Sequence, residues 1–260
     1  MVNNNIKRYG APSVKKAFEI LGALSSSKEG LGVSEIARGL NMAKSTVHGM
    51  TSTLEELGAV KRDPHTKRYR LGLTLFELGR VAYSQIDLKT LARPIIEELM
   101  EKTQASVFLG ILNWDHVTVL DIVESRQDLK ITAPIGTTLP LFAGAVGKVF
   151  LASMEEEQTE KIIRSKRLTR FTENTIVDPE LYYQELRRVR KMGYAVDDEE
   201  YILGVRAVAS PIMGLGQLMS AIWVVGFKAS LDEEMMKDII TMTRKAAEDI
   251  SRKIEKQPEN

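Results

Sequence analysis

The feature that most constrains the fold is a succession of three helical segments and a basic hairpin near the start of the chain. Apolar residues recur at helical spacing from Val14 to Leu24 and again over residues 33–40. A tight connection at Asn41 leads to a third helical segment over residues 43–57, and Gly58 suits its C-terminal end. This order of elements is typical of a helix-turn-helix.

The outward face of the third helix carries no acidic residue before Glu55. A solvent-facing helix normally mixes glutamate with lysine. A helix that enters the major groove instead needs donors near its N-terminus and no carboxylate to repel phosphate. We therefore predict that this helix contacts DNA through Lys44, Ser45, Thr46, His48 and Thr51.

A basic hairpin follows this helix. Residues 60–62 and 68–71 are predicted strands, and residues 63–66 carry turn formers. Five of the eleven residues from Lys61 to Leu71 are basic. A solvated charged hairpin has the same composition. Together with the acid-free helix, however, the hairpin indicates a winged helix-turn-helix whose wing serves the DNA backbone through Lys67, Arg68 and Arg70.

The net charge of +1 hides an uneven distribution. Residues 1–83 contain 13 Lys or Arg against 7 Asp or Glu, whereas the rest of the chain contains 23 against 28. A basic head on an acidic body indicates that only the head meets a polyanion. The chain has no cysteine, no apolar run at its start and no segment of membrane-spanning length. We expect a cytoplasmic protein without a membrane partner.

The remaining chain predicts a linker helix and a second domain. Residues 73–86 are apolar on more than one side, so this helix packs either on its copy in a second subunit, which we favour, or on its own C-terminal domain. Predicted strands joined by short turns and flanked by helices cover residues 106–112, 117–123, 129–133, 194–197, 206–212 and 218–225. We expect an α+β protein with a winged domain (1–72), a linker helix (73–86) and a C-terminal domain (87–260) with a mainly antiparallel sheet.

Five segments resemble the IclR family of bacterial transcription regulators. They are SVKKAFEILGAL, VSEIARGLNMAKSTVHGMTSTLEELGAV, KRYRLGLTLFELG, LPLFAGAVGKVFLA and GYAVDDEEYILGVRAVASPI, which together represent both halves of the family pattern. The resemblance implies operator DNA as partner, a GAF-like six-stranded effector domain for a small, often anionic metabolite, and a homodimer or dimer of dimers. Many members carry Arg where this chain has Gly49, so operator preference does not carry over.

The resemblance also implies an effector site. Its residues in this chain are Gly144, Ala145, Val146, Gly147, Asp197, Val205, Ala207, Trp223 and Val225. Free N–H groups where a helix begins after the glycine loop attract a carboxylate, although such a loop also serves simple packing. Ala207 replaces a common Cys, and Trp223 and Val225 replace serines of some members. These changes predict an apolar pocket for an aromatic or medium-chain carboxylate, unless Trp223 fills it.

Two rival functions deserve comparison. The acidic run Asp197–Glu200 suggests metal binding or acid–base catalysis, but neighbours on a strand point to opposite faces. No histidine pairs with a nucleophile in the sequence pattern, so we expect no enzyme, no metal and no cofactor. The other rival is an interaction protein that keeps the winged shape without binding an operator, and Gly49 is its best support.

Overall fold

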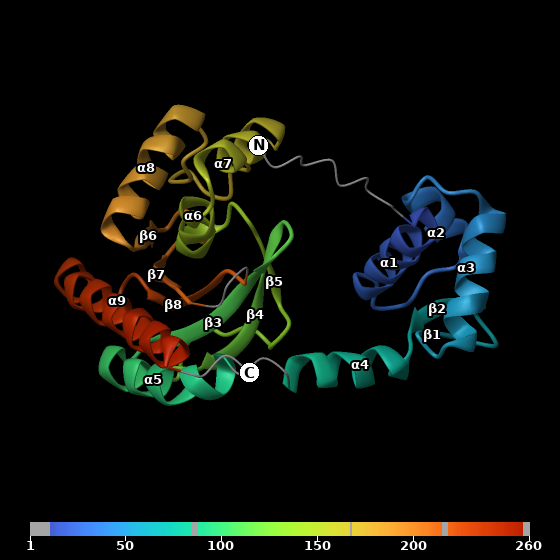
Figure 1. Cartoon of the computed structure of the whole chain (residues 1–260), viewed down its shortest axis with the longest axis horizontal. Coiled ribbons are helices and arrows are strands. Elements are labelled where there is room, and N and C mark those ends of the chain that lie inside the picture. The colour runs from blue at the N-terminus through green and yellow to red at the C-terminus, as the bar shows by residue number, and fades with distance from the viewer. Residues whose placement is uncertain (1–10, 85–87, 167, 215–217, 257–260) are drawn as a thin grey trace. The chain divides into compact units, whose positions relative to one another are not determined.

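The computed structural model describes residues 11–84, 88–166, 168–214 and 218–256, and its contacts divide the chain into two units, residues 1–86 and 87–260. The first unit contains three helices, a hairpin and a further helix (Figure 1). These elements are α1 (Pro12–Ser25), α2 (Val33–Gly39), α3 (Lys44–Glu56), β1 (Val60–Arg62), β2 (Tyr69–Leu71) and α4 (Leu73–Ser84). The order is that of the predicted winged helix-turn-helix.

The core of this first unit draws on all of its first five elements. Ile20, Ile36, Val47, Val60 and Tyr69 meet there, each at most 2% exposed. The N-terminal part of the apolar stripe predicted for the first helix does not join them. Val14 and Phe18 are 56% and 70% exposed, whereas Ala17 and the residues of the C-terminal half of α1 pack on the core.

Gly72, between β2 and α4, contacts the turn that joins α3 to β1. The amide of Gly72 donates to the carbonyl of Ala59 at 2.8 Å. A Cβ atom at position 72 would lie 2.1 Å from the carbonyl oxygen of Gly58. Two backbone segments therefore pass each other here at a distance that only glycine allows.

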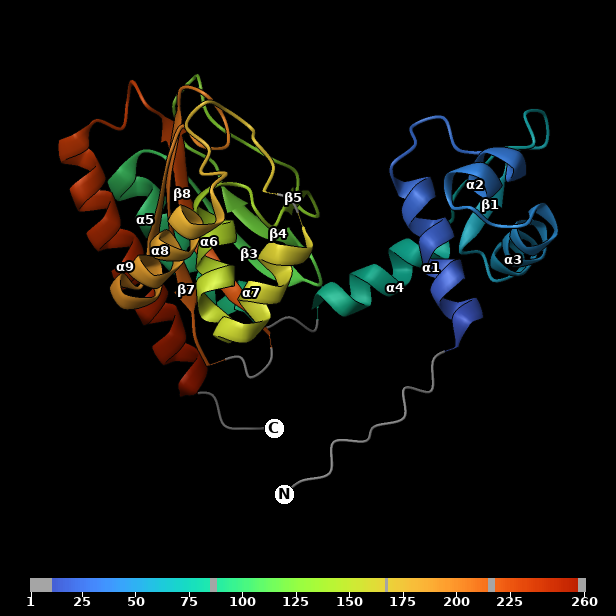
Figure 2. The same cartoon turned by 90° about the horizontal axis from the view of Figure 1, so that it is seen from above.

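The second unit is built on one six-stranded sheet (Figures 1 and 2). Its elements are α5 (Leu88–Thr103), β3 (Ser106–Asn113), β4 (His116–Val123), β5 (Thr138–Pro140), α6 (Gly144–Ser153), α7 (Glu156–Ser165), α8 (Pro179–Met192), β6 (Ala195–Asp198), β7 (Val205–Ile212), β8 (Ser220–Phe227) and α9 (Glu233–Glu255). The strand order is β5-β4-β3-β8-β7-β6, and every neighbouring pair is antiparallel.

Helices cover both faces of this sheet. Helices α5 and α9 pack on one face, and α6 packs on the other, with α7 and α8 beyond it (Figure 2). Because side chains alternate along a strand, Phe108, Ala207 and Trp223 share the face toward α6. The residues with the strongest functional indications thus lie between the sheet and α6.

The prediction of a strand over residues 129–133 was wrong. These residues form part of a loop between β4 and β5, and the sixth strand is the short β5, which pairs with β4. The apolar side chains that suggested a strand face a cavity instead. Ile131 and Ala133, with Thr132 between them, line a cavity on the α6 face instead of extending a ladder.

We predict opposite effects for two glycine substitutions in the first unit. Gly72→Ala destabilises it by about 1–3 kcal/mol, because the methyl group meets a backbone oxygen that cannot move aside. Gly22→Ala, in α1 with nothing within 4 Å of the added atom, stabilises it by up to about 1 kcal/mol. Thermal unfolding of the two variants measures the difference, and equal melting temperatures would contradict it.

Candidate functional site

Helix α3 has one face in the core and one in solvent. Val47, Thr51 and Leu54 are buried, whereas Ser45 and His48 are exposed. Gly49 lies on the same outward face, and a Cβ atom there would meet nothing within 4 Å. This exposed face therefore carries small and polar side chains with Lys44 and has no acidic residue before Glu55.

The prediction that Thr51 contacts DNA was wrong. Its side chain is fully buried, and its hydroxyl donates to the carbonyl of His48 at 3.1 Å. Thr51 follows Val47 by four residues, so it falls on the same buried stripe. The other four residues predicted on this helix are accessible: Lys44, Ser45 and His48 are exposed and Thr46 is half-buried.

The tip of the wing is an ordered turn. The carboxylate of Asp63 accepts hydrogen bonds from the amides of Thr66 at 2.7 Å and His65 at 2.9 Å, and these bonds lower the pKa of that carboxyl. Lys67 follows in a left-handed conformation, with φ of 59°, and its side chain is exposed. Arg70 is exposed beside Lys61, its cross-strand partner.

Arg68 makes contacts within the protein that the sequence did not indicate. Its guanidinium bonds the carboxylate of Glu35 at 2.6 Å and the carbonyl oxygen of Gly30. Glu35 in turn accepts the amide of Gly32 at 2.7 Å, which is the main reason that its pKa is lowered. Arg68 thus connects the wing to the start of α2 through both terminal nitrogens of its guanidinium, while about a third of the side chain stays exposed.

A cavity of about 200 Å³ lies between the sheet and α6. Eight of the nine predicted effector residues line it: Gly144, Ala145, Val146, Asp197, Val205, Ala207, Trp223 and Val225. The ninth, Gly147, does not. A Cβ atom on Gly147 would lie 2.0 Å from the carbonyl oxygen of Leu141, so this glycine serves packing of α6 on the preceding loop.

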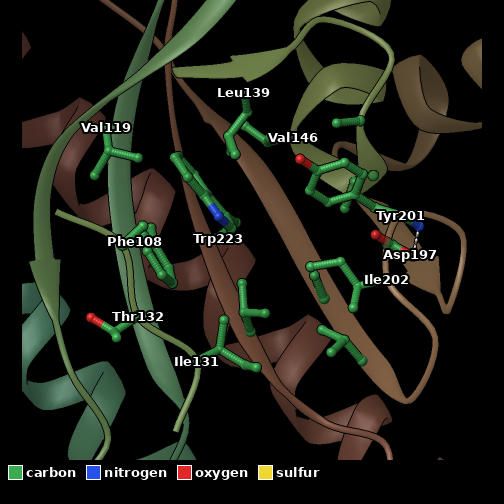
Figure 3. A pocket seen from close by; sticks show the side chains of 17 residues that line it. Phe108, Val119, Ile131, Thr132, Leu139, Val146, Asp197, Tyr201, Ile202 and Trp223 are labelled. Carbon is green, nitrogen blue, oxygen red and sulfur yellow. Dashed lines mark hydrogen bonds between the residues drawn. The ribbon is translucent and has the colours of Figure 1, made fainter. Parts of the chain in front are cut away.

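Trp223 forms a wall of the cavity and leaves it open (Figure 3). Its indole stacks on Phe108 with 5.4 Å between ring centroids and 8° between planes. The ring also covers Gly110, where a Cβ atom would lie 2.8 Å from it. The glycine makes room for the indole over β3. A cavity of about 200 Å³ remains beside the ring, so the alternative that Trp223 fills the pocket does not hold.

Asp197 provides the polar end of the cavity. One carboxylate oxygen accepts the amides of Glu200 at 2.6 Å and Tyr201 at 3.4 Å. Its other oxygen lies 2.4 Å from the point where a Cβ on Gly144 would stand. Burial raises the pKa of the Asp197 carboxyl, against the opposing effect of the two amides and of Lys148.

This arrangement changes the expectation for the start of α6. The sequence suggested that free N–H groups there attract a ligand carboxylate, but the carboxylate of Asp197 already lies at that position. No Lys, Arg or His is among the described residues that line the cavity. An anionic ligand group at the start of α6 would therefore face a like charge.

A buried lysine supports this end of the cavity from behind. Lys148 is 2% exposed, and its ammonium donates to the carbonyl of Val196 at 2.9 Å and to the carboxylate of Glu200. Glu185 of α8 lies 3.7 Å away. Burial raises the pKa of Glu200, while Lys148 opposes the shift. The lysine holds the loop after β6, which carries Tyr201, against α6.

The acidic run after β6 does not converge on one point. Asp198 pairs with Arg206 at 2.7 Å, Glu199 with Lys228, and Glu200 with Lys148. Each carboxylate beyond Asp197 therefore has its own cation. Within the described ranges, no group of three or more His, Cys, Asp or Glu side chains is arranged to hold a metal ion.

Nine further residues line the cavity that the sequence did not single out. They are Phe108, Val119, Ile131, Thr132, Ala133, Leu139, Ala143, Tyr201 and Ile202. Leu139, Ala143, Tyr201 and Ile202 fall within the two segments that resemble the effector domain, so their position was a usable signal. Phe108 and Val119 come from other strands, and only the strand order brings them to Trp223.

Two family models match this chain. The IclR helix-turn-helix domain matches residues 13–64, and the model described as bacterial transcriptional regulator IclR C-terminal matches residues 81–252. The chain belongs to the IclR family. It is a DNA-binding transcription regulator, and its named relatives in the family are regulators rather than enzymes.

Individual members of the IclR family resemble the chain over most of its length. The regulator BhcR of Paracoccus denitrificans is 34% identical over 93% of this chain and 87% of its own. KdgR of Escherichia coli is 32% identical over 92% and 91%. The crystal structure of an IclR-family regulator from Alicyclobacillus acidocaldarius has a TM-score of 0.79 at 28% identity and covers 95% of this chain and 100% of its own. No helix in the described part of the chain is long and apolar enough to cross a membrane.

We predict that substitution of Lys67 changes DNA binding, whereas substitution of Arg68 changes the stability of the first unit. Lys67→Ala weakens binding to every duplex. It also makes the slope of log affinity against log salt concentration less negative by about 0.9, the value for the loss of one phosphate contact. Arg68→Ala lowers the melting temperature of the first unit, because the wing loses its attachment to α2. Lys161→Ala on α7 is the control and changes neither quantity. An unchanged salt slope for Lys67→Ala would remove the wing tip from the interface.

Proposed function

We propose that this IclR-family regulator changes its operator binding when an aromatic or medium-chain carboxylate occupies the cavity beside Trp223. One observation carries the proposal: an indole that stacks on Phe108 forms a wall of a mainly apolar cavity. A ring or chain of the ligand gains dispersion and burial against this wall, whereas a small keto-acid leaves it uncovered. Such a protein acts on bacterial DNA, and hence in the cytoplasm.

The DNA contacts are part of the same proposal. Lys44, Ser45, Thr46 and His48 approach base edges in the major groove, and Lys67, Arg68 and Arg70 contact the backbone. Support comes from the exposed, acid-free face of α3 and from the ordered turn beneath Lys67. Binding that is insensitive to salt would favour the alternative of a winged interaction protein, because phosphate neutralisation releases counterions.

We predict that Trp223→Ser weakens binding of an aromatic acid by more than about 1 kcal/mol, the value of a lost aromatic contact. Isothermal titration calorimetry with phenylpropanoate measures the change. Trp114→Phe is the matched control, because Trp114 is 92% exposed in the turn after β3. Tight binding of pyruvate or glyoxylate by the unmodified protein would overturn the proposed effector class.

We also propose that the regulator acts as a homodimer at least, with α4 in the contact. The exposed fractions of Leu73, Phe76, Leu78 and Val81 range from 46% to 69%. Four large apolar side chains on one twelve-residue helix are a surface that a second copy can cover. A two-fold dimer of winged helices then reads a near-palindromic operator with half-sites spaced by helical turns.

The oligomer proposal predicts a specific loss. Leu78→Glu on α4 yields monomers at low micromolar concentration, because a carboxylate at a buried contact costs more than the contact gains. Leu181→Glu on α8 is the matched control, since this leucine is exposed to a similar extent, 57% against 62%, and its variant stays dimeric. Light scattering distinguishes the species, and a monomeric unmodified protein would refute the proposal.

A further inference from the structure

A second cavity shares two lining residues with the first and lies at the end of the sheet where α5 ends and α9 begins. It measures about 330 Å³ and is lined by residues from the end of α5, the start of β3, the loop after β4, the end of β8 and the start of α9. Ile131 and Val225 line both cavities, so these two side chains are the partition between them. We call the first the inner chamber and the second the outer chamber.

The register of the sheet fixes how the chambers are arranged. Asp197 pairs with Ala207, Ala207 with Val225, and Val225 with Ser106, so these four residues form one row across β6, β7, β8 and β3. With neighbouring strands about 4.8 Å apart, the carboxylate end of the row lies about 10 Å from the partition at Val225. Ser106, one strand further, lines the outer chamber.

Charge divides the two chambers cleanly. Among the described residues that line them, Asp197 is the one acid, in the inner chamber, and Lys130 is the one base, in the outer chamber. Lys130 pairs with Glu124 at 2.8 Å, and its side chain is 37% exposed, so a ligand anion in the outer chamber would share this ammonium with Glu124. Between these two ends lie the indole of Trp223 and the apolar side chains of Val225 and Ile131.

Size also favours use of both chambers together. Ligand pockets commonly measure about 300 Å³ or more, and the inner chamber falls short of that range. Ile131 belongs to the loop between β4 and β5, outside the strands, so its side chain can yield more readily than one within the ladder. A ligand longer than a single ring has space only if it passes this residue.

We infer that the effector is bipolar: a flat apolar body with a hydrogen-bond donor that meets Asp197 at one end and an anionic group that meets Lys130 at the other. This inference rests on the proposed function and specifies its ligand. The donor end suits the carboxylate oxygen of Asp197 that faces Gly144, since a second carboxylate there would meet a like charge. The anionic end suits the outer chamber, which Lys130 lines, where a ligand anion would compete with Glu124 for the ammonium.

Three probes of related shape test the inference in calorimetry on the full chain. They are 3-(4-hydroxyphenyl)propanoate, which has both ends, 3-phenylpropanoate, which lacks the donor, and 4-ethylphenol, which lacks the acid. We expect the first to bind at least about tenfold more tightly than the second, because the donor meets a charged acceptor. We expect it to bind about fivefold more tightly than the third, because Lys130 is partly exposed.

Two lysine variants separate the chambers. Lys130→Met weakens the binding of 3-(4-hydroxyphenyl)propanoate about fivefold and leaves the affinity for 4-ethylphenol unchanged. Lys166→Met is the matched control, since Lys166 also pairs with an acid at 2.8 Å, is 42% exposed and lines neither chamber. We expect this variant to change neither affinity. Equal binding of the three probes, binding of none of them, or no effect of Lys130→Met would overturn the bipolar effector.

Operator binding is measured in the same preparations without any probe. Salt-dependent, sequence-specific binding that persists while the probes fail rejects the bipolar ligand and leaves the regulator function standing. Absence of operator binding in the unmodified protein rejects the proposed function itself. The two failures are therefore distinguishable.

Discussion

The effector unit is organised around one buried positive charge. The ammonium of Lys148 is removed from water and must find its partners inside the protein, because an unpaired buried charge costs several kcal/mol. It finds them on three other segments: Val196 of β6, Glu200 of the loop after it, and Glu185 of α8. Helix α6, which carries the lysine, is thereby fixed in depth and rotation against the sheet.

This single constraint sets the geometry of the inner chamber. Lys148 follows Gly144 by one turn of α6, so the start of that helix is held where it meets Asp197. The loop that Glu200 anchors also carries Tyr201 into the wall, and Thr175 holds the same loop through a bond to the carbonyl of Glu200 at 2.7 Å. The opposite wall needs no charge, because Trp223 and Phe108 are placed by strand register alone.

The sequence was a good guide to elements and a poorer one to the contacts between them. Local patterns predicted the winged helix and the antiparallel sheet, since apolar spacing reports directly on helices and strands. Thr51 was misplaced because composition alone does not show which side of a helix faces the core. The pairing of Arg68 with Glu35 could not be predicted, because Glu35 lies 33 positions earlier in the chain. Phe108 was missed for the same reason, since it is brought to Trp223 by strand order.

Gly110, which the indole of Trp223 covers, is required by the backbone of the sheet as well as by the indole. Gly110 lies at a register shift in the ladder of β3 and β4, and a Cβ atom there would come within 2.7 Å of the carbonyl oxygen of Thr118 whatever residue stands at position 223. The backbone irregularity alone therefore maintains the glycine. The room for a large ring at position 223 is thus a property of the β3 backbone, and Trp223→Ser would leave it in place. A side chain at position 110 would instead take up that room, because its Cβ atom would meet both the Thr118 carbonyl oxygen and the indole.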